Sequence, residues 1–176
     1  TTSSATLPFI TINDVLINRK FSNQFPVPIV LGIEEYLNGT LLSYINELGY
    51  VSLGFESGQH DDIEAVVNAK AFVYLTLYFS GVIIKENRRF FKCFNQLNSA
   101  ANNISSVFEI VHLHSIKIDD SFKMLNGFKS FQKIKKGNEL ATSNNIKKKS
   151  EYRGRIFMPL YQEKGNEGFF IIKKIQ

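Results

Sequence analysis

Cysteine is nearly absent from this sequence. Its single cysteine, Cys93, cannot form an intramolecular disulfide, which excludes the disulfide-stapled folds of small secreted domains. Residues 1–4 do not form a basic segment followed by an apolar one, so they do not resemble a signal peptide. We therefore expect a reducing compartment and predict a cytoplasmic protein.

Long hydrophobic runs are also missing. The most apolar window, residues 71–84, is flanked by Lys70 and Lys85 and is shorter than the roughly 20 residues that cross a bilayer. We predict that this window is a core helix of a soluble protein, and we expect no membrane partner.

Charged residues are common in this sequence, but basic and acidic residues are unevenly distributed along the chain. The chain has 176 residues, of which 44% are hydrophobic, the composition of a folded protein of about one domain. Residues 1–98 contain seven basic and nine acidic residues, whereas the remainder contains fourteen basic and seven acidic residues. Such a skew suits nucleic acid or another anionic partner. However, Lys129, Lys133 and Lys135 stand in an alternating apolar segment, which favours the solvated face of a half-buried strand.

Hydrophobic patterning divides the chain into two parts. Residues 1–98 alternate strands and helices and predict an α/β layer, whereas residues 99–176 predict an all-β domain. In the first part, we expect strands over 6–12, 26–33 and 50–55, and helices over 15–25, 41–48, 61–81 and within 85–106. In the second part, we expect strands over 107–118, 128–134, 154–161 and 169–175, with an exposed loop over 144–151.

A polar cluster, residues 56–62, directly follows the strand expected over 50–55. Ligands bind beyond the carboxyl ends of parallel strands, so Glu56 is placed to act as a general base. The alternative is an ordinary loop or capping carboxylate. His60, Asp61 and Asp62 suggest a metal site, but helix capping, with Asp61 and Glu64 as a capping box, explains the acidic residues more simply.

Two further histidines stand two residues apart on one expected strand. His112 and His114 would point to the same face, as two zinc ligands do. No third ligand lies near them in the sequence, which favours polar packing between strands.

Three segments together resemble one enzyme family. Residues 54–62, 114–137 and 157–170 resemble, in order and spacing, the succinylglutamate desuccinylase/aspartoacylase family of zinc hydrolases, whose core is similar to that of zinc carboxypeptidases. The resemblance covers nearly the whole chain. It implies the C-terminal part of an α/β/α sheet in residues 1–98, followed by an all-β, barrel-like domain in residues 99–176.

The resemblance also implies a reaction and its residues. Family members are deacylases that hydrolyse N-acyl amides of small molecules such as acylated amino acids, using zinc and a catalytic carboxylate. Glu56 matches that carboxylate, and Tyr161 matches a tyrosine that binds substrate. About ten residues before the catalytic glutamate, where aspartoacylase has a substrate-binding arginine, this sequence has Asn46, which argues against aspartoacylase-like substrate choice.

The zinc ligands that the resemblance implies are not found in the sequence. The family binds zinc through a His-x-x-Glu motif and a later histidine that is followed by Thr- and Ser-rich residues like residues 1–4. We therefore expect this chain to be the C-terminal portion of a longer enzyme whose ligands precede Thr1. Alone, it should hold no metal and be inactive. The expected partner is a small-molecule N-acyl substrate and no nucleic acid.

One alternative comes from another functional class. The basic second part would then be a non-catalytic β module that binds nucleic acid or another anionic polymer, with steep salt dependence. A homo-oligomer also stays open, since an exposed sheet edge favours self-association.

Overall fold

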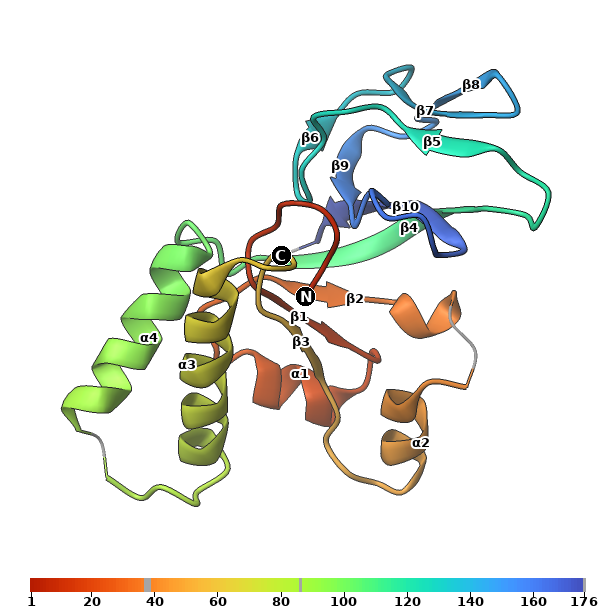
Figure 1. Cartoon of the computed structure of the whole chain (residues 1–176). Coiled ribbons are helices and arrows are strands. Elements are labelled where there is room, and N and C mark those ends of the chain that lie inside the picture. The colour runs from red at the N-terminus through yellow and green to blue at the C-terminus, as the bar shows by residue number, and fades with distance from the viewer. Residues whose placement is uncertain (37–38, 86, 176) are drawn as a thin grey trace.

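The computed structural model describes residues 1–36, 39–85 and 87–175. Within these residues the chain forms a mixed α/β fold with four α-helices, one short 3-10 helix and two sheets (Figure 1). The helices are α1 (Leu16–Ser22), η1 (Ile33–Glu35), α2 (Leu41–Glu47), α3 (Ile63–Phe79) and α4 (Arg88–Ala100). The strands are β1 (Phe9–Ile12), β2 (Ile29–Leu31), β3 (Gly54–Glu56), β4 (Val107–Ser115), β5 (Phe122–Met124), β6 (Lys133–Ile134), β7 (Glu139–Ser143), β8 (Ile146–Lys149), β9 (Gly154–Phe157) and β10 (Glu167–Lys174).

The larger sheet runs through both parts of the chain. Its seven strands have the order β3-β1-β2-β4-β10-β9-β6. β1 and β2 are parallel, β2 and β4 are parallel, and the pairs from β4 onward are antiparallel. Since β2 pairs directly with β4, the sheet continues across the boundary expected after residue 98. That boundary stays a prediction.

The strand that ends at Glu56 differs from expectation. β3 is antiparallel to β1, with Glu56 opposite Phe9, so the prediction of a parallel strand end was wrong. The apolar content of residues 50–55 cannot distinguish the two directions, because both kinds of strand bury the same side chains. Glu56 nevertheless lies at the end of its strand.

The helices cover one face of this sheet. Side chains of β1 and β2 pack against α3, α4 and the residues around α1 in one hydrophobic cluster, which includes Ile10, Ile12, Leu31, Leu75 and Leu97. Three aromatic rings extend it, with Phe55 stacked on Phe72 at 3.9 Å and Phe72 on Phe25 at 4.7 Å. No helix among the described residues is long and apolar enough to pass through a membrane.

The opposite face is covered differently from the expected second helical layer. There, Phe9, Val30 and Phe108 pack with Phe131 and Phe157, which come from the second part of the chain. Within the described residues, strands, loops and Ile33 of the short helix η1 build the layer over this face. The α/β/α layering is therefore not seen in this part of the chain.

The barrel expected in residues 99–176 is also not seen. β3 and β6 are the two ends of the larger sheet, and β5-β7-β8 form a separate three-stranded sheet (Figure 1). The described strands therefore close no barrel. A third cluster, including Met124, Leu140, Ile156 and Phe169, fills the space between the two sheets.

Two local predictions in this part were wrong. Residues 146–149 are not loop but strand β8, which forms a hairpin with β7 through Asn144 and Asn145, both at positive φ. Residues 128–134 form only the short β6, because Phe131 has φ 68° and breaks the extended backbone. Lys129, Lys133 and Lys135 are exposed, as expected.

Candidate functional site

The first residues of the chain lie beside the end of β3. The Thr2 amide donates a hydrogen bond to the Gly58 carbonyl at 3.0 Å, and the His60 amide donates to the Thr2 carbonyl at 2.9 Å. These bonds form a parallel bridge between Thr2 and Gln59. Two segments nearly 60 residues apart in the sequence are thereby fixed side by side.

The turn after β3 requires glycine. Gly58 has φ 148°, a conformation that side chains with a Cβ rarely adopt, and a Cβ there would lie 3.2 Å from that of Ala65 on α3. The turn therefore packs directly on the start of α3. The Asn68 side chain fixes it by donating to the Ser57 carbonyl at 2.9 Å.

Glu56 faces the start of the chain. Its Oε2 lies 2.5 Å from the Thr1 nitrogen, and the side chain is 30% exposed. Oε2 itself is buried, and its contact with Thr1 has the distance of an ion pair without the alignment of a hydrogen bond. Among the described residues, this oxygen accepts no hydrogen bond. A buried carboxylate oxygen with unused acceptor capacity suits a group that receives a proton from a bound molecule.

The remaining polar residues of the cluster have separate roles. His60 Nδ1 lies 2.8 Å from the Thr1 hydroxyl. Asp62 is the N-cap of α3 and accepts from the Glu64 amide at 3.0 Å, whereas Asp61 is in the left-handed conformation at φ 61°. Capping thus explains an acidic residue here, as predicted, but the capping residue is Asp62 and not Asp61.

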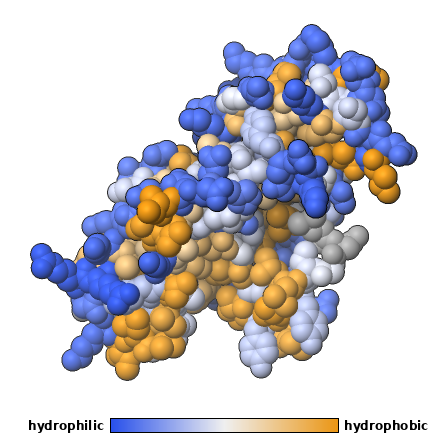
Figure 2. Space-filling view, in the orientation of Figure 1, coloured by the Kyte–Doolittle hydropathy of each residue, from blue (hydrophilic) through white to orange (hydrophobic). Residues whose placement is uncertain are grey.

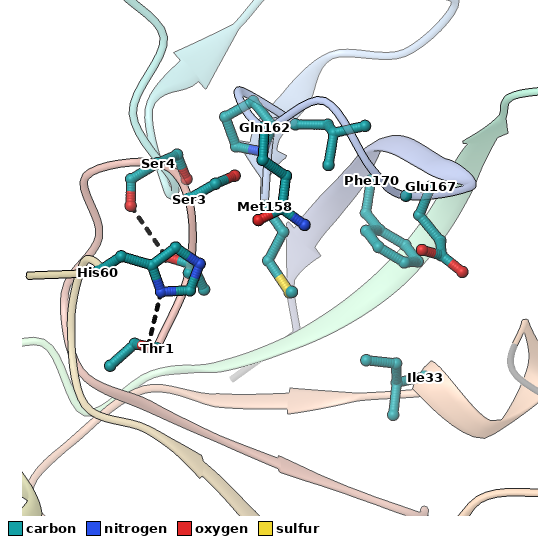
Figure 3. A pocket seen from close by; sticks show the side chains of 13 residues that line it. Thr1, Ser3, Ser4, Ile33, His60, Met158, Gln162, Glu167 and Phe170 are labelled. Atoms are coloured by element: carbon teal, nitrogen blue, oxygen red, sulfur yellow. Dashed lines mark hydrogen bonds between the residues drawn. The ribbon is translucent and has the colours of Figure 1, made fainter.

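A pocket of about 270 Å³ opens beside Thr1 and His60 (Figure 3). Thr1, Ser3 and His60 line one side. The other side comes from the loop after β9 and from β10, including Met158, Gln162, Glu167 and Phe170. The pocket therefore combines hydroxyl, imidazole, amide and carboxylate groups with a partly apolar wall.

Tyr161 lies in the same loop but points away from this pocket. It lines a neighbouring pocket of about 380 Å³ that shares Leu160, Gln162 and Gly165 with the first. Its hydroxyl donates to the Leu125 carbonyl at 2.8 Å and accepts from the Phe128 amide at 2.9 Å. Burial raises the pKa of this phenol, while the bond from Phe128 acts in the opposite direction. Its role in substrate binding stays a prediction.

Asn46 has a structural role. Its side chain exchanges hydrogen bonds with that of Asn18, at 2.9 and 3.2 Å, and donates to the Tyr50 carbonyl at 2.8 Å. Asn18 in turn accepts from the Ser52 amide. This network joins α1, α2 and the segment before β3.

The histidine pair on β4 packs against aromatic rings and not in the polar packing between strands that the sequence favoured. The His114 ring is stacked on Phe169 at 5.1 Å, and His112 lies 5.6 Å from the Tyr152 ring. Burial lowers the pKa of both imidazoles. No three His, Cys, Asp or Glu side chains in the described ranges lie close enough together to hold a metal ion, so these residues do not by themselves fit a zinc site.

Most residues on the far side of the pocket were not singled out from the sequence. Met158, Gln162 and Glu167 enter the pocket from the segments on which the family resemblance rests, but the resemblance pointed to Tyr161 instead. Alternating hydrophobicity does not identify them, because they lie in or beside a loop. The sequence could not show that this loop contacts the first residues of the chain. One such contact is the hydrogen bond that the Tyr161 amide donates to the Ser3 hydroxyl at 3.2 Å.

Comparisons with known proteins show what the fold is similar to. No family model matches the sequence, and no curated protein matches it either. Among solved structures, a succinylglutamate desuccinylase/aspartoacylase from Rhodobacter sphaeroides matches with a TM-score of 0.71 and 12% identity over 99% of this chain and 56% of its own.

Two other solved structures give the same result. An aspartoacylase family protein from Mesorhizobium loti matches with a TM-score of 0.61 and 12% identity, over 99% of this chain and 54% of its own. A succinylglutamate desuccinylase from Vibrio cholerae matches with a TM-score of 0.60 and 12% identity, over 98% and 50%. This chain spans about half the length of the solved structures that it matches. The family resemblance is thus confirmed in its fold: the chain folds like part of a succinylglutamate desuccinylase/aspartoacylase family protein.

Proposed function

We propose that this chain is part of a zinc-dependent deacylase that hydrolyses N-acyl amides of small molecules, with Glu56 as the general base. The observation that carries the proposal is the position of Glu56. In a fold like that of the deacylases, its buried Oε2 lies 2.5 Å from the nitrogen of Thr1, and Thr1 in turn lines the pocket.

The proposal divides the chemistry between two parts of a longer protein. The described residues hold no set of three metal ligands, so zinc would be held by groups outside them. Bound zinc polarises a carbonyl and lowers the pKa of water. The part played by this chain is to accept a proton at Glu56 and return it to the leaving amine. In a longer chain, the Thr1 nitrogen is an uncharged peptide group, so the ion pair with Glu56 is lost and its carboxylate is free to act.

The pocket walls support a small polar substrate. Thr1, Ser3 and His60 offer hydroxyl and imidazole groups on one side, and Gln162 offers an amide on the other. The volume of this pocket, about 270 Å³, is close to the lower end of the range for small-molecule sites. A cytoplasmic location, with a free cysteine tolerated at Cys93, belongs to the same proposal.

The test compares Glu56→Gln with the wild-type complete gene product. We expect the variant to retain its metal and to lose about 100- to 10,000-fold in amide hydrolysis, the usual contribution of a general base. Glu47→Gln, an exposed position on α2, removes the same charge and should leave the rate unchanged. If Glu56→Gln retains its activity, the assignment of the base is wrong.

A second measurement tests where the metal is held. We expect the complete gene product to contain one zinc ion per chain, and residues 1–176 expressed alone to contain none. Stoichiometric zinc together with turnover in the isolated residues would overturn the proposed division between the two parts.

A further inference from the structure

A second concave surface lies far along the sheet from Glu56, at the edge formed by β6, β9 and β10. It has a volume of about 750 Å³. Six of its ten lining residues are basic and none is acidic: Lys133, Lys135, Arg153, Arg155, Lys173 and Lys174. We call this surface the basic groove.

Strand register places three of these charges on one face. Lys133 is opposite Arg155, and Arg155 is opposite Ile172. Cross-strand partners share a face, and so do residues two apart on a strand. Lys174 therefore joins Lys133 and Arg155 on one side, while Lys173 belongs to the other. Lys135 and Arg153 lie just beyond the ends of β6 and β9 and line the same groove.

Close packing fixes β9 and the side chain of Arg155. A Cβ at Gly154 would lie 2.7 Å from the Ile172 carbonyl oxygen, so only glycine lets β9 approach β10 so closely at this point. Arg155 is further held by its bond to the Phe131 carbonyl at 2.7 Å and by the Phe108 ring at 5.6 Å. An arginine that is ordered in advance loses less conformational freedom when it binds an anion.

Among the described residues, no carboxylate forms an ion pair with a groove cation. The ion pairs of the described residues use the Thr1 amine, Arg19, Lys147 and Lys149 as cations, and none of the groove residues. Glu109 is opposite Lys173 on β4, but Lys173 Nζ lies over the Tyr152 ring at 5.5 Å. With six basic and no acidic lining residues, the groove carries an excess of positive charge, which favours binding of a multivalent anion.

The kind of anion follows from the shape and the lining. Nucleic-acid strands are held by cations along a track, usually with aromatic rings that stack on bases. Here the cations converge on one groove. The nearby rings of Phe108 and Tyr152 are covered by Arg155 and Lys173 respectively. Arginine forks suit phosphate oxygens in particular.

We propose that the basic groove binds a compact oligophosphate, such as a triphosphate group, either free or as part of a nucleotide. This site is separate from the pocket beside Glu56 and does not depend on the proposed deacylase activity. The oligophosphate is held by charge and by the arginine forks, without recognition of a base.

Isothermal titration calorimetry tests the proposal. Inorganic triphosphate is titrated into the complete gene product at physiological salt concentration. We expect saturable binding. The variant Lys133→Gln/Arg153→Gln/Lys174→Gln removes three exposed groove charges and should weaken binding at least tenfold. The matched control Lys20→Gln/Lys70→Gln/Lys92→Gln removes three exposed helix charges and should change it less than twofold.

Each other outcome is also decisive. Adenosine triphosphate that binds like inorganic triphosphate shows that the phosphate chain is the recognised group. The proposal is overturned if triphosphate does not bind, or if both triple variants weaken binding equally, which would show a general effect of net charge. It is also overturned if a single-stranded oligonucleotide binds through the groove while triphosphate does not.

Discussion

The two parts of the molecule bury their apolar residues in different ways. The part before β4 packs helices on a sheet, and it leaves many large apolar side chains exposed, such as Leu16, Leu41, Ile63 and Ile84. Figure 2 shows orange patches along the lower edge of this part, whereas the upper part that contains β5, β7 and β8 is mostly blue. The second part encloses its apolar residues between two sheets and exposes lysines. One shared sheet thus supports an apolar surface and a basic one.

Core truncation in each part should have the largest effect on stability. Leu75 on α3 and Leu140 on β7 are both fully buried, in separate clusters. We expect Leu75→Ala and Leu140→Ala each to lower the free energy of unfolding by about 2–5 kcal/mol. Because β2 pairs with β4, both variants should shift a single urea transition, followed by circular dichroism. Leu77→Ala, at a partly exposed position, is the control. Two separate transitions, each moved by one variant, would instead support independent domains divided near residue 98.

Substitution of one glycine in each part should have the next largest effect on stability, and the effect should differ between the two parts. At Gly154, a Cβ meets the Ile172 carbonyl oxygen at 2.7 Å, and a backbone atom in a sheet cannot move aside. At Gly54, the Cβ meets the Thr11 hydroxyl at the same distance, but this group can rotate. We expect Gly154→Ala to lower the free energy of unfolding by about 1–3 kcal/mol, and Gly54→Ala to lower it less. Equal losses in thermal unfolding would contradict this ranking.

Helix capping gives a smaller effect, confined to the first part. Asp62→Ala removes the bond to the Glu64 amide, so it should lower the free energy of unfolding by about 1 kcal/mol. Asp61→Asn keeps a residue that tolerates positive φ and should change it by less than about 0.5 kcal/mol. Chemical denaturation measures both changes. An unchanged free energy of unfolding in Asp62→Ala would contradict the assignment of Asp62 as the cap of α3.

Acidification should lower the free energy of unfolding through two histidines of the second part. We expect this to be the smallest of the effects on stability, because both histidines are only partly buried. Burial lowers the pKa of His112 and His114 below their unfolded value, so the unfolded chain binds more protons. Their contribution is therefore complete above the unfolded pKa and declines as the pH falls through it. His114→Phe keeps the ring stack on Phe169 and should reduce this decline between pH 7.5 and 5.5, measured by thermal unfolding. An unchanged pH dependence would assign the decline to other groups.

Local patterns predicted most of the first part. The spacing of apolar residues gave helices near 41–48 and 61–81, and the structure has α2 and α3 there. Those signals are local, since amphipathic spacing and caps act within a few residues. The predicted direction of β3 was wrong, because the direction of a strand in a sheet is defined relative to its partner. Here the partner is β1, which lies more than 40 residues away in the sequence.

The second part was harder to predict because its strands are short. The run of lysines over 147–149 indicated a loop, yet β8 pairs with β7, and Lys147 and Lys149 lie near Glu139 across the hairpin at 3.0 and 3.8 Å. Phe131 shows the same limit, because its φ is positive and its ring packs against Phe9 and Phe157, which are distant in the sequence. Of the candidate site, the position of Glu56 at a strand end was expected, but the pocket walls formed by Met158 and Gln162 were not.

The place of β10 in the sheet has a consequence for biosynthesis. β10 lies between β4 and β9, although it is the last of the described strands in chain order. While a ribosome still holds residues 167–174, the inner edges of β4 and β9 have no partner, and these unpaired edges are prone to aggregation. The sheet can therefore be completed only after translation has passed these residues, and a nascent chain stalled before them would need protection by a chaperone.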